Sequence, residues 1–186
     1  MSQTLKVVAV SGSLSHPSRS AVLVDTLLER LAAERSVEVH RVTLVDIAAQ
    51  LGSVLSAKQA PLALASHLRA IESADVLVVA SPVYRASYTG LFKHLFDLID
   101  HEALIDVPVL LAATGGSERH ALVIDHQLRP LFSFFQAQTL PVGVYATDAD
   151  FTDYRISSPA LLERIALATQ RALPLLKPRQ RVAQPA

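Results

Sequence analysis

One stretch decides the fold of this chain: Val7-Val8-Ala9-Val10-Ser11-Gly12-Ser13-Leu14-Ser15-His16-Pro17-Ser18-Arg19-Ser20. Its first four residues are apolar and mostly β-branched, which favours a buried strand. The apolar run ends in a loop that is rich in small and hydroxyl-bearing residues. Residues 21–31 follow at once and carry leucines at helical spacing. The stretch therefore predicts a strand, a tight loop and a helix N-terminus, in that order.

The loop at residues 11–20, which we call the phosphate loop, has the features of an anion-binding site. The first backbone N–H groups of a helix have no partner within the helix, and the helix dipole places partial positive charge there. An ordinary N-capped turn between a strand and a helix remains the alternative, but such a turn needs neither an arginine nor so many serines. We expect this loop to bind a phosphate group through Arg19 and the hydroxyl groups of Ser11, Ser13, Ser18 and Ser20.

The phosphate loop lacks the two best-known nucleotide-binding motifs. It contains no Gly-x-x-x-x-Gly-Lys-Ser/Thr, which disfavours a nucleotide triphosphatase, and no Gly-x-Gly-x-x-Gly, which disfavours a dinucleotide-binding fingerprint. A terminal monophosphate held by hydroxyl groups points instead to a mononucleotide such as FMN.

Length and composition favour a single α/β domain. The chain has 186 residues, of which 51% are hydrophobic, and no apolar run is long enough to cross a membrane. It contains no cysteine, which excludes disulfides and thiol catalysis, and its 17 acidic and 17 basic residues argue against a nucleic-acid surface. The N-terminus lacks the regions of a signal peptide, so we expect a cytoplasmic protein. We expect one domain over residues 1–176 and a disordered tail over residues 177–186.

Strand and helix patterns alternate along the chain. Apolar or alternating runs predict further strands at residues 37–44, 75–80, 107–113 and 140–145. Helical spacing predicts helices at residues 62–73, 89–99, 119–138 and 159–176, and the poorly periodic residues 45–61 are expected to form loop and short helix. This order predicts an α/β three-layer sandwich, with a five-stranded parallel sheet of order 2-1-3-4-5 and helices on both faces.

Two further loops reach the carboxyl edge of such a sheet, where ligands bind between the first and third strands. Backbone donors and an aromatic ring that suit an isoalloxazine follow the third strand, in the proline loop that contains Pro82, Val83, Tyr84, Arg85 and Ser87. The glycine loop Thr114-Gly115-Gly116 follows the fourth strand and has so little bulk that a flat ring can approach its backbone. A plain strand end and a plain turn remain the alternatives for either loop alone, but the three loops together favour a flavin site.

The three loops resemble the NAD(P)H-dependent FMN reductase family of flavodoxin-like folds. The match extends through residues 112–116 and 125–130 and into the helix after the proline loop, where Tyr88, Gly90, Lys93 and Asp97 fit the family pattern. Within the family, the sequence is most similar to the reductase components of two-component alkanesulfonate and methanesulfonate monooxygenase systems. The similarity covers residues 6–154. It departs at Leu14-Ser15, where many relatives have Pro-Arg and with it one more basic residue near the phosphate.

The resemblance implies that the protein reduces FMN with NADH or NADPH and releases reduced flavin to a flavin-dependent sulfonate monooxygenase. Hydride passes between stacked nicotinamide and flavin rings, so no side chain is expected to act as a catalytic acid, base or nucleophile. An FMN-bound reductase of quinones, azo compounds or metal ions uses the same loops and remains the alternative. The zero net charge disfavours a flavodoxin-like electron carrier. The seven histidines lack the spacing of a metal-binding motif, so no metal site is expected.

The residues before Pro130 are expected to depart from a regular helix. Proline has no N–H to donate to the carbonyl of residue 126, and its ring crowds that carbonyl. The sequence therefore predicts a bend or a π-bulge at His126. In the related reductases the matching position holds an inserted tyrosine in a π-helix at a tetramer interface. This sequence carries histidine there, and the resemblance implies that His126 lies at a subunit interface near the flavin edge and helps to keep FMN exchangeable between turnovers.

Apolar residues on the helices after the third and fourth strands predict a homodimer or a homotetramer. Because one parallel sheet has limited area to cover, we expect part of this set at a contact between copies. Burial within a single copy is the alternative. The set comprises Leu91, Phe92, Leu95, Phe96, Leu131, Phe132, Phe134 and Phe135.

Overall fold

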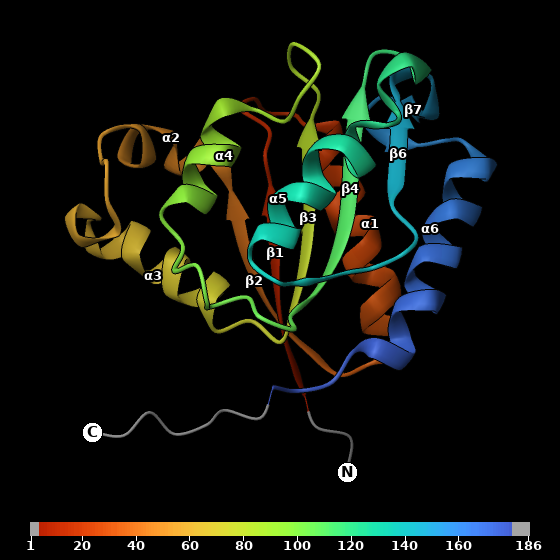
Figure 1. Cartoon of the computed structure of the whole chain (residues 1–186). Coiled ribbons are helices and arrows are strands. Elements are labelled where there is room, and N and C mark those ends of the chain that lie inside the picture. Colours follow the sequence, from red (N-terminus) through yellow and green to blue (C-terminus); the bar gives the residue numbers. More distant parts are fainter. Residues whose placement is uncertain (1–3, 180–186) are drawn as a thin grey trace.

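A parallel β-sheet forms the centre of the molecule (Figure 1). The computed structural model describes residues 4–179. The strands are β1 (Leu5–Ser11), β2 (Val37–Thr43), β3 (Val76–Pro82), β4 (Pro108–Gly115), β5 (Gln138–Thr139) and β6 (Val144–Thr147). They lie in the order β2-β1-β3-β4, with β5 and β6 both paired to β4, and every one of these pairs is parallel. The predicted sheet order is confirmed.

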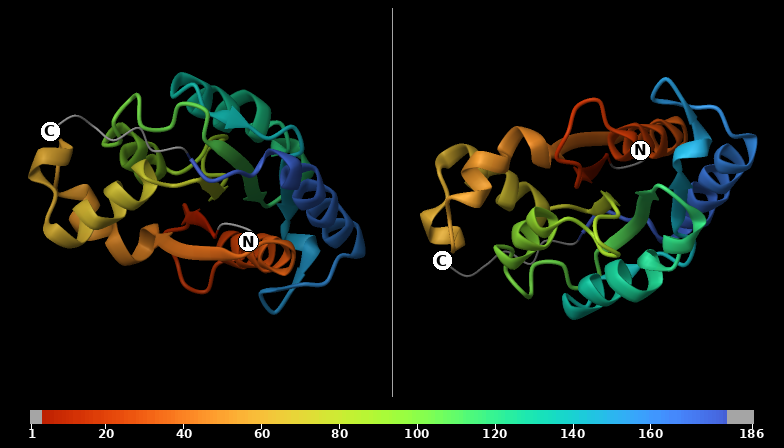
Figure 2. Two further views of the ribbon diagram at one scale, coloured as in Figure 1. Left: turned by 90° about the horizontal axis from the view of Figure 1, so that it is seen from below. Right: turned by 90° about the horizontal axis from the view of Figure 1, so that it is seen from above.

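Helices cover both faces of the sheet (Figure 2). The helices α1 (Arg19–Glu34) and α6 (Pro159–Ala172) pack on one face, and α2 (Leu44–Gly52), α3 (Leu62–Glu72), α4 (Gly90–Asp97) and α5 (Arg129–Phe134) pack on the other. Alternation along β1 serves both layers, because Val8 and Val10 pack with α2–α5 whereas Val7 and Ala9 pack with α1. The predicted three-layer α/β sandwich is confirmed, and α2 is the short helix expected within residues 45–61.

Shorter elements connect or extend these layers. The 3-10 helices are Ala57–Gln59, Glu118–His120, Asp148–Asp150 and Leu173–Leu175, and a π-helix spans Ile124–Leu128. The strands β7 (Phe151–Thr152) and β8 (Arg155–Ile156) form a small antiparallel hairpin that was not predicted. No described helix is long and apolar enough to span a lipid bilayer.

The chain beyond α6 is bonded to the amino ends of the strands. The backbone N–H of Arg179 donates to the Asp75 carboxylate at 2.8 Å, and its guanidinium donates to the carbonyls of Glu72 and Ala103. Asp75 also accepts the N–H of Lys6 at the start of β1. The remainder of the tail for which we predict disorder, residues 180–186, lies outside the described residues.

Hydroxyl side chains start the helices that surround the carboxyl edge of the sheet. Ser18 Oγ accepts the N–H of Ala21 at 3.2 Å, and Thr89 Oγ1 accepts the N–H of Phe92 at 3.3 Å. The Thr89 hydroxyl donates in turn to the carbonyl of Gly12 at 2.9 Å. The start of α4 is therefore tied to the phosphate loop. A Cβ at Gly12 would lie 2.9 Å from the Phe92 ring, so this close approach requires glycine.

The prediction of one continuous strand over residues 140–145 is wrong. β5 ends at Thr139, opposite Val109 of β4, and β6 begins at Val144, opposite Ala112. The chain advances five residues from Thr139 to Val144, whereas β4 advances only three residues from Val109 to Ala112. The two extra residues form a bulge at the edge of the sheet. Pro141 lies between β5 and β6, where its missing N–H breaks no ladder hydrogen bond.

The prediction of one helix over residues 119–138 is also wrong, but the predicted π-bulge is confirmed. The segment consists of a 3-10 turn, the π-helix Ile124–Leu128 and α5. The N–H of Arg129 donates to the carbonyl of Ile124, five residues back instead of the four of an α-helix. Pro130 follows directly and has no N–H to donate. His126 is exposed within the π-helix.

Most of the apolar residues expected at a contact between copies lie in the core of one copy. Their aromatic rings fill the space between α4 and α5, and the Phe96 and Phe132 rings meet edge to face with centroids 4.8 Å apart. Phe134 is exposed and Leu91 is half-buried. The buried members are Phe92, Leu95, Phe96, Leu131, Phe132 and Phe135. For these six residues, the alternative of burial within one copy is confirmed.

Gly115 ends β4 against the side chain of Tyr145 in β6. The Tyr145 hydroxyl donates to the carbonyl of Ser117 at 2.6 Å, and a Cβ at Gly115 would collide with that hydroxyl. Burial, together with the negative charges of Glu118 and Asp148, raises the pKa of Tyr145, so the hydroxyl stays protonated and able to donate. Glycine at position 115 therefore leaves room for the Tyr145 side chain, whose hydrogen bond to Ser117 stabilises the glycine loop.

We expect Gly115→Ala to destabilise the protein by about 1–3 kcal/mol, the usual cost of forcing extra atoms into a packed site. Each kcal/mol lowers Tm by roughly 2–4 °C in a domain of this size. Gly116→Ala is the matched control, because a Cβ there meets nothing within 4 Å. In a Tyr145→Phe background, which lacks the colliding hydroxyl, Gly115→Ala should cost less. Thermal denaturation measures all of these variants, and equal Tm values for Gly115→Ala and Gly116→Ala would contradict the clash.

Candidate active site

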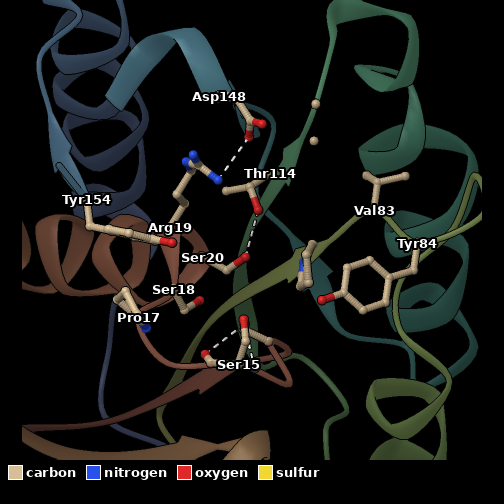
Figure 3. Close-up of a pocket in the computed structure, with 14 residues that line it drawn as sticks. Ser15, Pro17, Ser18, Arg19, Ser20, Val83, Tyr84, Thr114, Asp148 and Tyr154 are labelled. Atoms are coloured by element: carbon tan, nitrogen blue, oxygen red, sulfur yellow. Dashed lines mark hydrogen bonds and ion pairs between the residues drawn. The ribbon is translucent and has the colours of Figure 1, made fainter. Parts of the chain in front are cut away.

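The three predicted loops meet in one pocket at the carboxyl edge of the sheet (Figure 3). The N-terminus of α1 contributes to the pocket wall, and the segment after β6 joins the three loops. Every residue predicted to bind FMN, except Ser11, Arg85 and Ser87, is part of the lining. The lining residues are Ser13, Ser15, Pro17, Ser18, Arg19, Ser20, Pro82, Val83, Tyr84, Thr114, Gly115, Gly116, Asp148 and Tyr154.

The phosphate loop offers donors at the N-terminus of α1. Ser18 accepts the N–H of Ala21, and this bond leaves its own hydroxyl hydrogen for another acceptor. Arg19 is the first residue of α1, and its buried Nε has no hydrogen-bond partner among the described residues. A buried donor without an acceptor is costly, so an anion at this end would satisfy Arg19 together with the first-turn N–H groups. These residues fit a phosphate group.

Hydrogen bonds of Ser13 and Ser20 stabilise the conformation of the loops around the pocket. Ser13 Oγ accepts the N–H of Ser15 at 3.3 Å, which folds the phosphate loop back on itself. Ser20 Oγ is hydrogen-bonded to Thr114 Oγ1 at 2.7 Å, and both side chains are buried. That bond ties the first turn of α1 to the glycine loop, so the predicted phosphate and ring regions keep a fixed spacing.

The proline loop presents Tyr84 on a tight turn. The N–H of Val83 donates to the glycine loop at 2.8 Å, and the N–H of Tyr84 donates to the carbonyl of Ser87 at 2.8 Å. Arg85 and Ala86 have φ values of 52° and 70°, a left-handed conformation that costs residues other than glycine about 1–2 kcal/mol each. The backbone donors predicted at Val83 and Tyr84 are therefore used within the protein. The loop contributes an apolar and aromatic wall.

Ser11, Arg85 and Ser87 belong to the predicted loops but do not line the pocket. Ser11 is buried at the end of β1, and its hydroxyl has no partner among the described residues. Arg85 is exposed in the tight turn of the proline loop, and Ser87 donates to the side-chain oxygen of Gln127 at 3.1 Å. Arg85 and Ser87 lie in or next to a turn with left-handed backbone angles. The sequence does not indicate this turn, because the turn contains no glycine.

Two residues outside the three predicted loops, Asp148 and Tyr154, complete the pocket. Nη1 of Arg19 lies 3.2 Å from the Asp148 carboxylate, and the guanidinium carbon lies 5.3 Å from the centre of the Tyr154 ring. Both residues follow β6, which is parallel to β4 and ends at the same edge of the sheet. The signal that could have found them is the rule that ligands bind beyond the carboxyl ends of all strands, including the last one.

Asp150 fixes the segment that carries Asp148. Its carboxylate accepts the backbone N–H of Thr147 at 2.7 Å and the Thr147 hydroxyl at 2.9 Å. Burial alone would raise the pKa of Asp150, but hydrogen bonds from Thr147 and Ser158 outweigh burial and lower it. Because the folded pKa is depressed, this stabilisation is fully present above the unfolded value of 3.8 and is lost as pH falls through the folded pKa. Asp148 is therefore held in place at neutral pH.

The pocket combines an anion site with a region suited to a flat ring. Ser18, Arg19 and the start of α1 form the anion site, whereas Tyr84 supplies an aromatic wall and Gly116 an open stretch of backbone. A ligand with a terminal phosphate and a planar ring system fits both parts, and FMN has both. The residues present therefore fit an FMN molecule.

Comparison with known proteins agrees with this fit. The model of the NADPH-dependent FMN reductase family matches residues 5–152. The chain is 61% identical to the NADH-dependent FMN reductase SfnF of Pseudomonas fluorescens, over 98% of this chain and 100% of that one. It is 62% identical to an FMN reductase (NADPH) of Pseudomonas aeruginosa, over 94% of each chain.

Solved structures share the fold and, in part, the sequence. An oxidoreductase from Corynebacterium diphtheriae matches with a TM-score of 0.82 at 34% identity, over 94% of this chain and 98% of that one. The apo form of the NADH:FMN oxidoreductase EMOB matches with a TM-score of 0.84 at 28% identity, over 95% and 92% of the two chains. The chain belongs to the NADPH-dependent FMN reductase family, whose chemistry uses FMN and a reduced nicotinamide nucleotide.

Proposed function

We propose that the protein handles FMN as an exchangeable substrate, which it binds in this pocket, reduces with NADH or NADPH, and passes to a flavin-dependent sulfonate monooxygenase. The observation that carries the proposal is the placement of Ser18 and Arg19, at the N-terminus of α1, in one pocket with the glycine loop. A phosphate bound at α1 leaves the part of the pocket near Tyr84 and Gly116 for the flavin ring.

The residues of the pocket would bind FMN and orient its ring. Ser18, Arg19 and the first-turn N–H groups of α1 would hold the phosphate, while the glycine loop admits a flat ring close to its backbone. Tyr84 offers an aromatic face to the same region. FMN, when bound, supplies the hydride acceptor. The protein's contribution is to position the two rings and to set their electrostatic surroundings, so we assign no catalytic acid, base or nucleophile.

An open pocket supports a flavin that exchanges between turnovers. The side chain of Arg19 is 38% exposed and Tyr84 is 46% exposed. A site of this kind suits delivery of reduced flavin to a second enzyme. The resemblance to the reductase components of sulfonate monooxygenase systems supports such a monooxygenase as the acceptor. We place the reaction in the cytoplasm, where NADH and NADPH are regenerated.

The decisive experiment separates an exchangeable substrate from a tightly held cofactor. Protein that has passed through gel filtration should be colourless, and it should oxidise NADH or NADPH only after free FMN is added. Running the assay with each nucleotide gives the preference between them. A protein that stays yellow and reduces a quinone, an azo dye or a ferric chelate without added FMN would instead be an FMN-bound reductase of those acceptors.

We expect Arg19→Ala to weaken FMN binding about ten- to a hundredfold, because a hydrogen bond to a charged group contributes roughly 1.5–3 kcal/mol. Riboflavin has no phosphate for the arginine to hold, so its binding should change little. Arg19→Lys keeps the charge but loses the planar fork of donors, and it should fall between the two. Quenching of flavin fluorescence measures each dissociation constant. If the variant binds FMN and riboflavin more weakly by the same factor, Arg19 does not contact the phosphate.

We also propose that the enzyme is a homodimer or a homotetramer, with the π-helix at a contact between copies. A groove between α4 and α5 is lined by apolar and polar side chains that include His126, Pro130 and Phe134. Phe134, which lines this groove, is 69% exposed. A large apolar side chain that is exposed in a groove suits a symmetric contact between copies.

Deleting His126 should return the segment to a regular α-helical register, because the π-helix loses its extra residue. We expect the variant to retain FMN through gel filtration, to turn over more slowly as a flavin reductase, and to change its oligomeric state in light scattering. His126→Ala is the control, since it removes the imidazole but keeps the chain length. A folded deletion variant that releases FMN and turns over normally would show that the π-helix has no role in flavin exchange. A monomeric wild-type protein at micromolar concentration would contradict the interface.

A further inference from the structure

Asp148 places a negative charge beside the arginine that we expect to hold the FMN phosphate. Arg19 and Asp148 are the charged side chains among the described residues that line the pocket. Nη1 of Arg19 lies 3.2 Å from Oδ1 of Asp148, and Figure 3 shows the two side chains reaching toward each other. The formal charges of the pocket lining therefore cancel before any ligand enters.

The position of Asp148 is built into the fold. It is the first residue of the 3-10 helix Asp148–Asp150, directly after β6, and Thr147 and Asp150 cap that helix with reciprocal hydrogen bonds. Thr147 is also paired with Gly115 of β4 in the sheet. The backbone therefore holds the Asp148 carboxylate near Arg19.

An FMN phosphate must approach an arginine that already has an anionic partner. A phosphate monoester carries a charge of about −1.5 to −2 near pH 7, and it seeks the same guanidinium as Asp148. The Arg19 side chain is 38% exposed and that of Asp148 is 57% exposed, so the pair is solvated and can open. When the phosphate binds, the Nη1 donor is shared or released, and the fixed carboxylate repels the second anion.

We propose that Asp148 is a built-in competitor of the FMN phosphate, which lowers the affinity of the pocket for FMN and keeps the flavin exchangeable. The inference rests on the proposed function, in which FMN is a substrate and not a permanent cofactor. Asp148 then affects the specificity of the pocket. Its charge reduces the preference for FMN over riboflavin that Arg19 alone would produce. If Asp148 served only to orient Arg19, its removal would instead weaken FMN binding.

The test compares FMN with riboflavin on the full chain, with quenching of flavin fluorescence as the readout. Asp148→Asn keeps the size of the side chain and removes its charge. We expect the Kd of FMN to fall about three- to fivefold, the scale of an exposed ion pair, and the Kd of riboflavin to stay within about twofold of wild type. The gain for FMN should shrink in about 1 M KCl, where the screening length is about 3 Å.

Two further variants control for charge and for position. Asp148→Glu keeps the carboxylate and should bind FMN no more tightly than wild type. Asp25→Asn removes a carboxylate from a matched ion pair, because Asp25 lies on α1, 3.1 Å from Arg41, with side chains that are 50% and 59% exposed. Asp25 is not part of the pocket lining within the described residues. We expect Asp25→Asn to change neither dissociation constant.

Unchanged or weaker FMN binding by Asp148→Asn would overturn the inference and leave the proposed function standing. Equal tightening of FMN and riboflavin would also overturn it, because riboflavin has no phosphate to compete with Asp148. A wild-type protein that binds neither flavin would contradict the proposed function itself. The outcomes for the inference and for the function are therefore distinct.

Discussion

Parallel pairing of β3 with β1 on one side and β4 on the other is the constraint on which the site depends. The register places Ser11 of β1 beside Ala80 of β3, so these strands end together at one edge of the sheet. β3 is buried on both faces, and a one-residue shift in its register would move every side chain to the opposite face and disrupt the packing on both sides of the sheet. The buried hydrogen bond between Ser20 and Thr114 then fixes the phosphate loop against the glycine loop. The register of the sheet therefore determines how the loops of the pocket are placed relative to one another.

Local patterns predicted the parts of the molecule that depend on local chemistry. The central strands are apolar runs in the sequence, the serines and Arg19 mark the phosphate loop, and Pro130 predicts the π-helix because the missing N–H belongs to that residue. The split edge strand and the place of Asp148 were not predicted, because both depend on how residues beyond 138 pair with β4. Helix periodicity also cannot separate a core residue such as Phe96 from an interface residue, since both lie on an apolar face.

Hydrogen bonds and close packing hold the backbone of the pocket, and the formal charges of its lining cancel. The turn at Arg85 and Ala86 holds Tyr84 at the edge of the pocket, and Tyr145 supports the glycine loop where Gly115 leaves room for it. The ion pair with Asp148 leaves the anion site with little net charge. A preformed shape with modest electrostatic attraction suits a flavin that enters, accepts hydride and departs.

A crystal structure of the protein with FMN tests the central claim most directly. We predict phosphate oxygens within hydrogen-bond distance of the Ser18 hydroxyl and the Arg19 guanidinium, and a flavin ring bounded by Tyr84 and Gly116. The distance between Arg19 Nη1 and Asp148 Oδ1 should lengthen beyond the 3.2 Å of the present structure. An FMN phosphate bound away from α1, for example in the groove between α4 and α5, would contradict the account.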